Sequence, residues 1–382
     1  MHVVLLTDGL FPNVVGGIQR HSALLARYLA EAGVDVTVFQ LDPGISGEPV
    51  AIAPEPGVGA GTVSVESVEV PREDPLPGHY LRGRRKQSAA MLARYRSLGL
   101  TADFVYAQGL LGIAFAQARR RGAALPPLGV NLHGFEPFQR PADLKTYLKQ
   151  RLLRPSICRR AREADLVFSF SGKIREIVEH RIGVPGDRIV EIPNGIEADW
   201  LCDAFGNRGG RRSLLFIGRW ERRKGIEELT KAISETSDLP YDIHFVGPIP
   251  EARKLALPHV HYHGTITDNA AMIGMIDAAD ALICPSYAEG MPTVILEAMA
   301  RGLAVIATDV GATREIVGED NGILLPDARP SVIEDALRTF VSWSDDALEQ
   351  KQQASRGRAS NYTWDVVAIR TINAIQRALA RT

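Results

Sequence analysis

Residues 281–315 read ALICPSYAEGMPTVILEAMARGLAVIATDVGATRE, in which two apolar runs flank a loop and a helical stretch. The apolar runs predict strands that are buried on both faces of a parallel sheet, and Pro292 is placed to start the helix between them. Glu289 and Gly290 lie in the loop, and Glu297 lies within the helix. Because the first turn of a helix offers unpaired N–H groups and a positive dipole end, we expect an anionic or hydroxyl-rich ligand there.

The alternation of strand and helix extends along the rest of the chain. In the carboxyl-terminal half, further strands are predicted at residues 213–218, 243–246 and 261–263. In the amino-terminal half, they are predicted at residues 3–7, 34–39, 104–107, 128–132 and 166–170. A glycine-containing loop and a helix at residues 18–32 join the first two strands into a Rossmann-type unit. The fold class is therefore α/β, with two Rossmann-like units in tandem.

The length of 382 residues favours two domains of similar size. We expect an amino-terminal domain over residues 1–195, a carboxyl-terminal domain over residues 196–362, and a last helix over residues 363–382 that packs back on the first domain. Residues 41–79 are rich in Pro and Gly and predict a long surface excursion facing a substrate. Within it, TVSVESVEV (residues 62–70) alternates in polarity and predicts an edge strand.

The composition is that of an ordinary globular protein, with 45% hydrophobic residues, 23% charged residues and a net charge of −1, which argues against a nucleic-acid partner. Residues 79–162 are an exception, because they hold 17 Lys and Arg residues against three acidic ones. Such a cationic region predicts contact with an anionic membrane surface or acceptor, and a solvated surface is the alternative. The three cysteines are widely spaced, and no apolar run has the roughly 18 residues of a membrane span. We expect a cytoplasmic protein, at most peripheral to the inner membrane face.

Arg219 and Lys224 follow the strand at residues 213–218, at the sheet edge where open α/β sheets bind ligands. Their positive charges suit a diphosphate leaving group, and a solvated basic loop is the alternative. Gly16 and Gly17 lie between the first strand and helix, where small residues let backbone N–H groups approach a phosphate. A plain tight turn is the alternative for this pair, because the spacing is not that of the GxGxxG fingerprint.

His133 ends a strand next to Gly134, so its imidazole is either a contact for a substrate hydroxyl or a satisfied structural histidine. His261 and His263 share one face of a strand, but further ligands at zinc spacing are missing, and no metal site is predicted. Glu289 and Glu297 are two carboxylic acids, the residue type that glycosidases use as acid and nucleophile. Their different settings, a loop and a helix, favour two separate ligand contacts instead.

The chain strongly resembles glycosyltransferase family four over nearly its whole length. The resemblance rests on EGMPTVILEAMARGLAVIATDVGATREIV, GRWERRKG, HYHGTI, IPNGI and GGIQRHSALLARYLAEAGVDVTV, which occur in the family's order. It implies the GT-B architecture, in which two Rossmann-like domains with parallel sheets face each other across a central cleft. It also implies a retaining enzyme of the hexosyltransferase type, which moves a sugar from a nucleotide diphosphate to an acceptor hydroxyl in polysaccharide, glycolipid or glycoconjugate biosynthesis.

The resemblance further implies roles for single residues. Arg219 and Lys224 would hold the donor diphosphate and stabilise the departing nucleotide. Glu289 would contact hydroxyls of the transferred sugar, Glu297 would hold the ribose, and His133 would lie beside the reacting sugar. The remaining donor contacts would come from Gly16, Gly17, Gly264, Thr265, Gly290, Met291, Pro292 and Thr293.

No cofactor and no metal are expected, because Arg219, Lys224 and helix dipoles would take over the electrostatic task of a metal. The expected partners are a UDP- or GDP-sugar donor and a sugar-containing or lipid-linked acceptor. Two alternatives share the scaffold. One is a sugar phosphorylase or sucrose-synthase-like enzyme, and the other is a nucleotide-sugar-binding protein without turnover.

Overall fold

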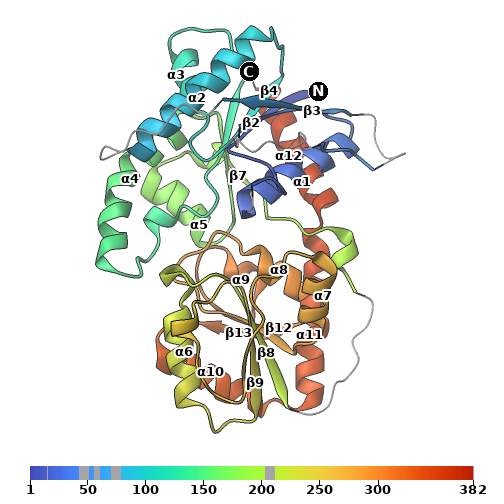
Figure 1. Ribbon diagram of the computed structural model, residues 1–382. Helices are drawn as coiled ribbons and strands as arrows, with labels where there is room; N and C mark the ends of the chain where they lie inside the picture. The colour runs from blue at the N-terminus through green and yellow to red at the C-terminus, as the bar shows by residue number, and fades with distance from the viewer. Residues whose placement is uncertain (15, 43–50, 56–60, 70–78, 203–210, 382) are drawn as a thin grey trace.

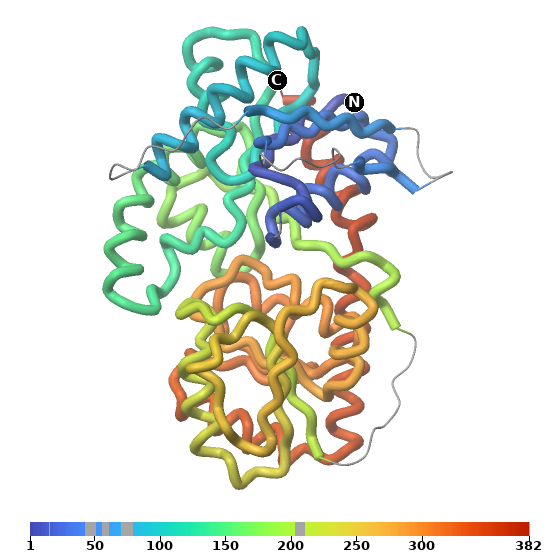
Figure 2. Tube along the Cα trace, in the orientation of Figure 1, coloured from blue at the N-terminus to red at the C-terminus, as the bar shows by residue number. Residues whose placement is uncertain are grey.

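The computed structural model describes residues 1–14, 16–42, 51–55, 61–69, 79–202 and 211–381, and these residues form two α/β domains. Figures 1 and 2 show the domain built from the amino-terminal half above the domain built from the second half. More than half of the predicted substrate-facing excursion at residues 41–79 lies outside the described residues.

The upper domain is built on a parallel sheet with the strand order β3-β2-β1-β4-β5-β6-β7. Its described strands are β1 (His2–Thr7), β2 (Asp35–Leu41), β3 (Val63–Val68), β4 (Phe104–Gln108), β5 (Leu128–Asn131), β6 (Leu166–Ser169) and β7 (Ile189–Glu191). The central strand β1 is continuously apolar, and Val3, Val4 and Leu5 are fully buried, as a strand covered on both faces requires. β3 lies at the end of the sheet beside β2, so the predicted edge strand is confirmed.

Helices pack around this sheet (Figure 1). They are α1 (Gly17–Glu31), α2 (His79–Ser97), α3 (Ile113–Arg120), α4 (Leu144–Glu163) and α5 (Lys173–Glu176), which continues into a π-helical turn at Ile177–Ile182. α1 buries Leu25, Ala26 and Leu29 on one face, as the apolar stripe in its sequence predicts. The helix ends shortly before Gly33, whose φ of 85° turns the chain toward β2.

The lower domain repeats the arrangement with the strand order β10-β9-β8-β11-β12-β13. Its strands are β8 (Arg212–Ile217), β9 (Tyr241–Val246), β10 (Val260–Tyr262), β11 (Ala281–Cys284), β12 (Ala304–Thr308) and β13 (Gly322–Leu325). Its helices are α6 (Ile226–Glu235), α7 (Asn269–Asp277), α8 (Thr293–Ala300), α9 (Thr313–Ile316), α10 (Pro330–Ser342) and α11 (Asp345–Ala359). Strand pairs are parallel in both sheets, which confirms the predicted α/β class.

The chain crosses between the domains twice, and the two crossing segments lie side by side. The first passage is the segment around Ile196, and the second passage is the segment around Thr363. Ile196 in the first passage and Thr363 in the second form an isolated parallel bridge. The N–H of Ile196 donates to the carbonyl of Tyr362 at 2.9 Å, and the N–H of Trp364 donates to the carbonyl of Ile196 at 3.0 Å. After the second passage, α12 (Trp364–Leu379) packs against α1 and adds its apolar face to the core of the upper domain.

α4 lies in the cationic region at residues 79–162, but its solvent side is apolar as well as basic. Leu144, Leu148 and Leu152 are 72%, 55% and 77% exposed. Their spacing of four residues places them in one stripe, and the exposed Lys145 and Lys149 lie beside it. Within the described residues, no helix is both long and apolar enough to cross a membrane.

The packing of α12 on the upper domain can be tested with two matched substitutions on that helix. Ile375 is fully buried and Ile369 is 51% exposed. We expect Ile375→Ala to lower the free energy of unfolding by about 2–5 kcal/mol, because it leaves a cavity. Ile369→Ala should change it by no more than about 0.5 kcal/mol. Urea denaturation followed by circular dichroism measures both, and equal losses would contradict the packing.

Candidate active site

A cleft of about 510 Å³ lies between the two domains. Its walls are formed by segments that follow the carboxyl ends of β1, β5, β6 and β7 in the upper sheet and of β8, β9, β10 and β11 in the lower sheet. Both sheets therefore present the same edge to the cleft. Because ligands of open α/β sheets bind at this edge, the cleft is where the fold places a substrate.

Glu289 is a buried acidic residue of the cleft with three side-chain partners. Its side chain is 9% exposed. One carboxylate oxygen accepts hydrogen bonds from Lys224 Nζ at 2.7 Å and Ser286 Oγ at 2.8 Å, and the other lies 3.1 Å from the Arg223 guanidinium. Burial alone raises the pKa of a carboxyl, but here Lys224 and Arg223 outweigh it, so the pKa of Glu289 lies below its ordinary value. Glu289 is therefore an ionised hydrogen-bond acceptor.

Backbone geometry brings Lys224 to Glu289. Gly225 has a φ of 66°, and a Cβ at this position would lie 2.0 Å from the carbonyl oxygen of Pro285. Only glycine lets the start of α6 approach the loop after β11 so closely. The N–H of Tyr287 donates to the carbonyl of Arg223 at 2.8 Å and ties the same two segments together.

The two predicted diphosphate contacts, Arg219 and Lys224, both line the cleft, but they do not share a partner. The Arg219 side chain is 72% exposed and forms an ion pair with Glu221 at 3.0 Å. Arg223, by contrast, pairs with Glu289 at 3.1 Å. Sequence reasoning missed it, because it is part of a basic loop. The only signal for Arg223 in the sequence is its place directly before Lys224.

The opposite wall of the cleft comes from the upper domain, where His133 and Gly134 follow β5. His133 has a φ of 53°, and its Nε2 lies 2.8 Å from Gln108 Oε1. Burial lowers the pKa of His133 to about 4, so the ring is neutral near pH 7. Gly134 meets Gly290 of the lower domain, and a Cβ on Gly134 would lie 2.8 Å from the Gly290 nitrogen. The domains touch here through bare backbone.

The other predicted donor contacts divide into two groups. The residues that line the cleft are Gly17, Thr265, Gly290, Met291, Pro292 and Thr293. Gly16 and Gly264 are each next in sequence to a lining residue, but they do not form the wall themselves. Asn194, which was not predicted, donates its Nδ2 to the carbonyl of Met291 at 2.6 Å and so fixes the start of α8 to the first passage.

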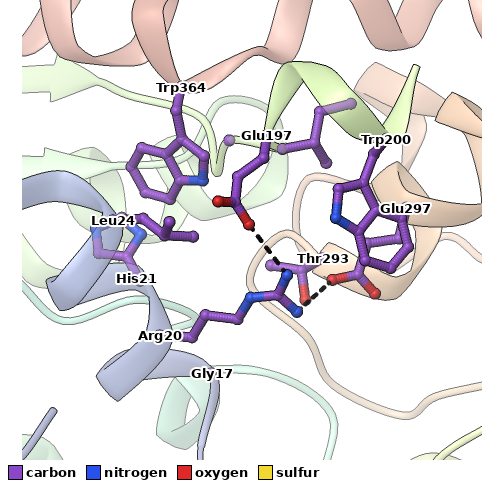
Figure 3. A pocket seen from close by; sticks show the side chains of 11 residues that line it. Gly17, Arg20, His21, Leu24, Glu197, Trp200, Thr293, Glu297 and Trp364 are labelled. Carbon is purple, nitrogen blue, oxygen red and sulfur yellow. Dashed lines mark hydrogen bonds and ion pairs between the residues drawn. The ribbon is translucent and has the colours of Figure 1, made fainter. Parts of the chain in front are cut away.

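Glu297 lies outside the main cleft, in a smaller pocket that adjoins it (Figure 3). There it forms an ion pair at 3.2 Å with Arg20, a residue of α1 that sequence reasoning missed. Arg20 also pairs with Glu197 at 3.4 Å. Burial raises the pKa of Glu297, and Glu197 adds to this, whereas Arg20 opposes it. Glu289 and Glu297 therefore have separate surroundings, unlike the two facing acids of a glycosidase.

The histidines of β10 and its surroundings gather at one end of the lower sheet. His244 stacks on His261 with 4.8 Å between ring centroids, and its Nδ1 lies 3.0 Å from Nε2 of His263. Among the described residues, no group of three or more His, Cys, Asp or Glu side chains is arranged to hold a metal ion.

Two family models match separate parts of the chain. The model described as Glycosyltransferase Family 4 matches residues 15–200, and the model described as Glycosyl transferases group 1 matches residues 211–342. The chain is also similar to the D-inositol 3-phosphate glycosyltransferase of Pseudarthrobacter chlorophenolicus, with 25% identity over an alignment that covers 96% of this chain and 91% of that protein.

Two solved structures share the fold. Sucrose-phosphate synthase from Thermosynechococcus elongatus aligns over 100% of both chains with a TM-score of 0.78 and 20% identity. Anabaena HepE, solved in complex with UDP-glucose, aligns over 100% of both chains with a TM-score of 0.70 and 18% identity. The predicted architecture of two Rossmann-like domains about a cleft is thereby confirmed.

The buried histidines of the cleft give a testable pH dependence. Burial lowers the pKa of His133 to about 4 and that of His21, which lies beside it, to about 3. The unfolded chain binds protons on both rings near pH 6.5, so the free energy of unfolding should fall as the pH drops from about 6.5 to 4.

Histidine-labelled protein followed by NMR measures this directly. The ring signals of His133 and His21 should remain those of neutral imidazole at pH 5.5, where the urea-unfolded protein shows protonated rings. His133→Asn assigns the signal, since asparagine tolerates the positive φ. A midpoint near 6.5 for either ring in the folded protein would contradict the burial of that ring.

Proposed function

Because the chain belongs to glycosyltransferase family four, and is thus a glycosyltransferase, we propose that it moves a sugar from a nucleotide-diphosphate sugar to an acceptor hydroxyl with retention of configuration. The observation that carries the proposal is the contact between Lys224 and Glu289 in a cleft formed by the carboxyl ends of both sheets. The binding of UDP-glucose by the structural neighbour HepE supports UDP-sugars as the first donors to test, with GDP-sugars second.

In the proposed reaction, the bond between the anomeric carbon and the diphosphate oxygen loosens first, and negative charge grows on the diphosphate. Lys224 stabilises this charge from the floor of the cleft, and Arg219 does so from its rim. The acceptor hydroxyl attacks the anomeric carbon from the side on which the diphosphate leaves. Its proton passes to the departing phosphate oxygen, so no protein nucleophile is needed.

The remaining groups of the cleft position the donor in this proposal. The carboxylate of Glu289 accepts hydrogen bonds from hydroxyls of the transferred sugar, and Glu297 accepts them from the ribose. The start of α8 directs backbone groups of residues 290–293 toward the ligand. His133, neutral near pH 7, hydrogen-bonds the sugar beside the reacting carbon. Because Lys224, Arg223 and Arg219 supply positive charge, we propose that the reaction proceeds without a metal ion.

We also propose that the acceptor is anionic or lipid-linked and that α4 holds the upper domain against an anionic membrane. The stripe of Leu144, Leu148 and Leu152 offers apolar surface to the acyl boundary, and Lys145 and Lys149 beside it offer charge to lipid phosphates. Arg120, Arg121 and Arg159 line a hollow of about 300 Å³ where α3 ends beside α4, which continues the cationic face.

Turnover tests the donor and the site together. The purified protein should release nucleotide diphosphate from one member of a panel of UDP- and GDP-sugars, and EDTA should not reduce the rate. Lys224→Met should lower kcat by about 10²- to 10³-fold, the usual loss when one stabilising charge is removed from a transition state. Liquid chromatography measures the free nucleotide, and NMR of the first product reports whether the anomeric configuration is retained.

Lys231→Met is the matched control, because Lys231 is exposed on α6 and away from the cleft. It should leave kcat unchanged. Full activity of Lys224→Met would overturn the site, and an inverted product would overturn the mechanism. Sugar release that depends on inorganic phosphate would indicate a phosphorylase, and tight nucleotide-sugar binding without any release would indicate a binding protein.

Flotation with vesicles tests the membrane contact. The protein should float with vesicles of phosphatidylcholine and phosphatidylglycerol at low salt, and not with phosphatidylcholine alone. Leu148→Glu should reduce the bound fraction at least tenfold, because it places a charge in the apolar stripe. Ile369→Glu on α12 is the control for an exposed apolar residue elsewhere and should bind as wild type. Equal flotation of the two variants would refute the role of α4.

A further inference from the structure

Arg20 bridges the two domains through two carboxylates (Figure 3). It extends from α1 of the upper domain, and its guanidinium contacts Glu297 on α8 of the lower domain at 3.2 Å. Its second contact is Glu197 in the first passage, at 3.4 Å. The guanidinium also lies over the ring of Trp200, 5.7 Å from its centroid. One side chain therefore links both domains and the segment that joins them.

The space around this bridge is too small for a sugar ring. The pocket lined by Arg20, Glu197 and Glu297 has a volume of about 30 Å³, which is room for about two water molecules. The neighbouring cleft has about 510 Å³ and shares Gly17 and Thr293 with the pocket, so the two spaces adjoin. A ligand that reaches Glu297 from the cleft must therefore move the Arg20 side chain.

Glu297 needs a partner at all times. Its side chain is 16% exposed, and an ionised carboxylate in such surroundings is costly without a cation or hydrogen-bond donors. In the described residues, Arg20 is the only cation that pairs with it. Any group that takes the place of Arg20 must itself donate hydrogen bonds to the carboxylate. A pair of vicinal hydroxyls, as on a ribose, meets this requirement.

We propose that Arg20 is a gate for the ribose of the donor: it occupies Glu297 in the empty enzyme and yields it to the ribose hydroxyls when the nucleotide binds. The proposal rests on the proposed function, because it takes Glu297 as the ribose contact. When Arg20 leaves Glu297, Glu197 keeps its charge paired, so the guanidinium moves between two carboxylates and is not released into an apolar site.

The gate is tested by whether nucleotide affinity rises or falls when Arg20 is replaced. Arg20→Gln should bind the nucleotide diphosphate of the donor about three- to tenfold more tightly than wild type, because the competitor for Glu297 is gone. The 2′,3′-dideoxy form of the same nucleotide should show no such gain, since it lacks the hydroxyls that compete. Isothermal titration calorimetry with UDP and GDP, and with their dideoxy forms, measures both effects.

Arg94→Gln is the matched control. Arg94 is on α2 and pairs with Glu66 at 2.7 Å, and it contacts neither Glu197 nor Glu297. It should leave the affinity for both nucleotides unchanged. Glu197→Gln removes the alternative partner of Arg20, so it should weaken nucleotide binding, and this loss should vanish in the double variant with Arg20→Gln.

The outcomes separate this inference from the proposed function. If wild type binds nucleotide and Arg20→Gln binds it equally or more weakly, the gate is refuted and the glycosyltransferase site stands. Weaker binding of the ribose and dideoxy forms alike would instead make Arg20 a phosphate contact. If wild type binds no nucleotide at all, the proposed function fails, and the gate fails with it. Unfolding curves of each variant exclude loss of the fold as the cause.

Discussion

A carboxylate inside a protein stays ionised only if donors or cations compensate it, and the interdomain site depends on this constraint at two positions. Lys224, Arg223 and Ser286 compensate Glu289, and all three belong to the same domain as Glu289. Arg20 compensates Glu297 from the other domain. The charge of Glu289 is thus compensated within one domain. The charge of Glu297 is compensated only where the two domains are in contact.

The closeness of the domains depends on small backbone contacts as much as on charge. Gly134 and Gly290 meet without side chains, and Gln139 links the same loops through the backbone of Glu289. Because Glu289 is in this loop, its position is coupled to the contact between the domains. The site therefore combines charge compensation within the lower domain with a wall from the upper domain that touches it through backbone.

The sequence allows the sheets and the family to be predicted, because burial on both faces leaves continuous apolar runs such as that of β1. It does not allow the ion pairs to be predicted. Arg20 and Glu297 are 277 residues apart, and no local pattern connects them. The leucine stripe of α4 shows a different limit: its spacing is visible in the sequence, but its exposure is not. Leucines four residues apart usually indicate a buried face, and only the tertiary neighbours reveal that this face is exposed.

The paired passages at Ile196 and Thr363 restrict how the two domains can move relative to each other. Two neighbouring segments joined by backbone hydrogen bonds resist sliding past each other, so we expect rotation about a single axis to be the easy motion. In Figure 1 the passages lie to the right and α4 lies to the left, so the helix is far from that axis. We then expect the cleft between the domains to open most widely on the side of α4, because that side is farthest from the axis. If the upper domain is held on a surface, the lower domain is the part that rotates.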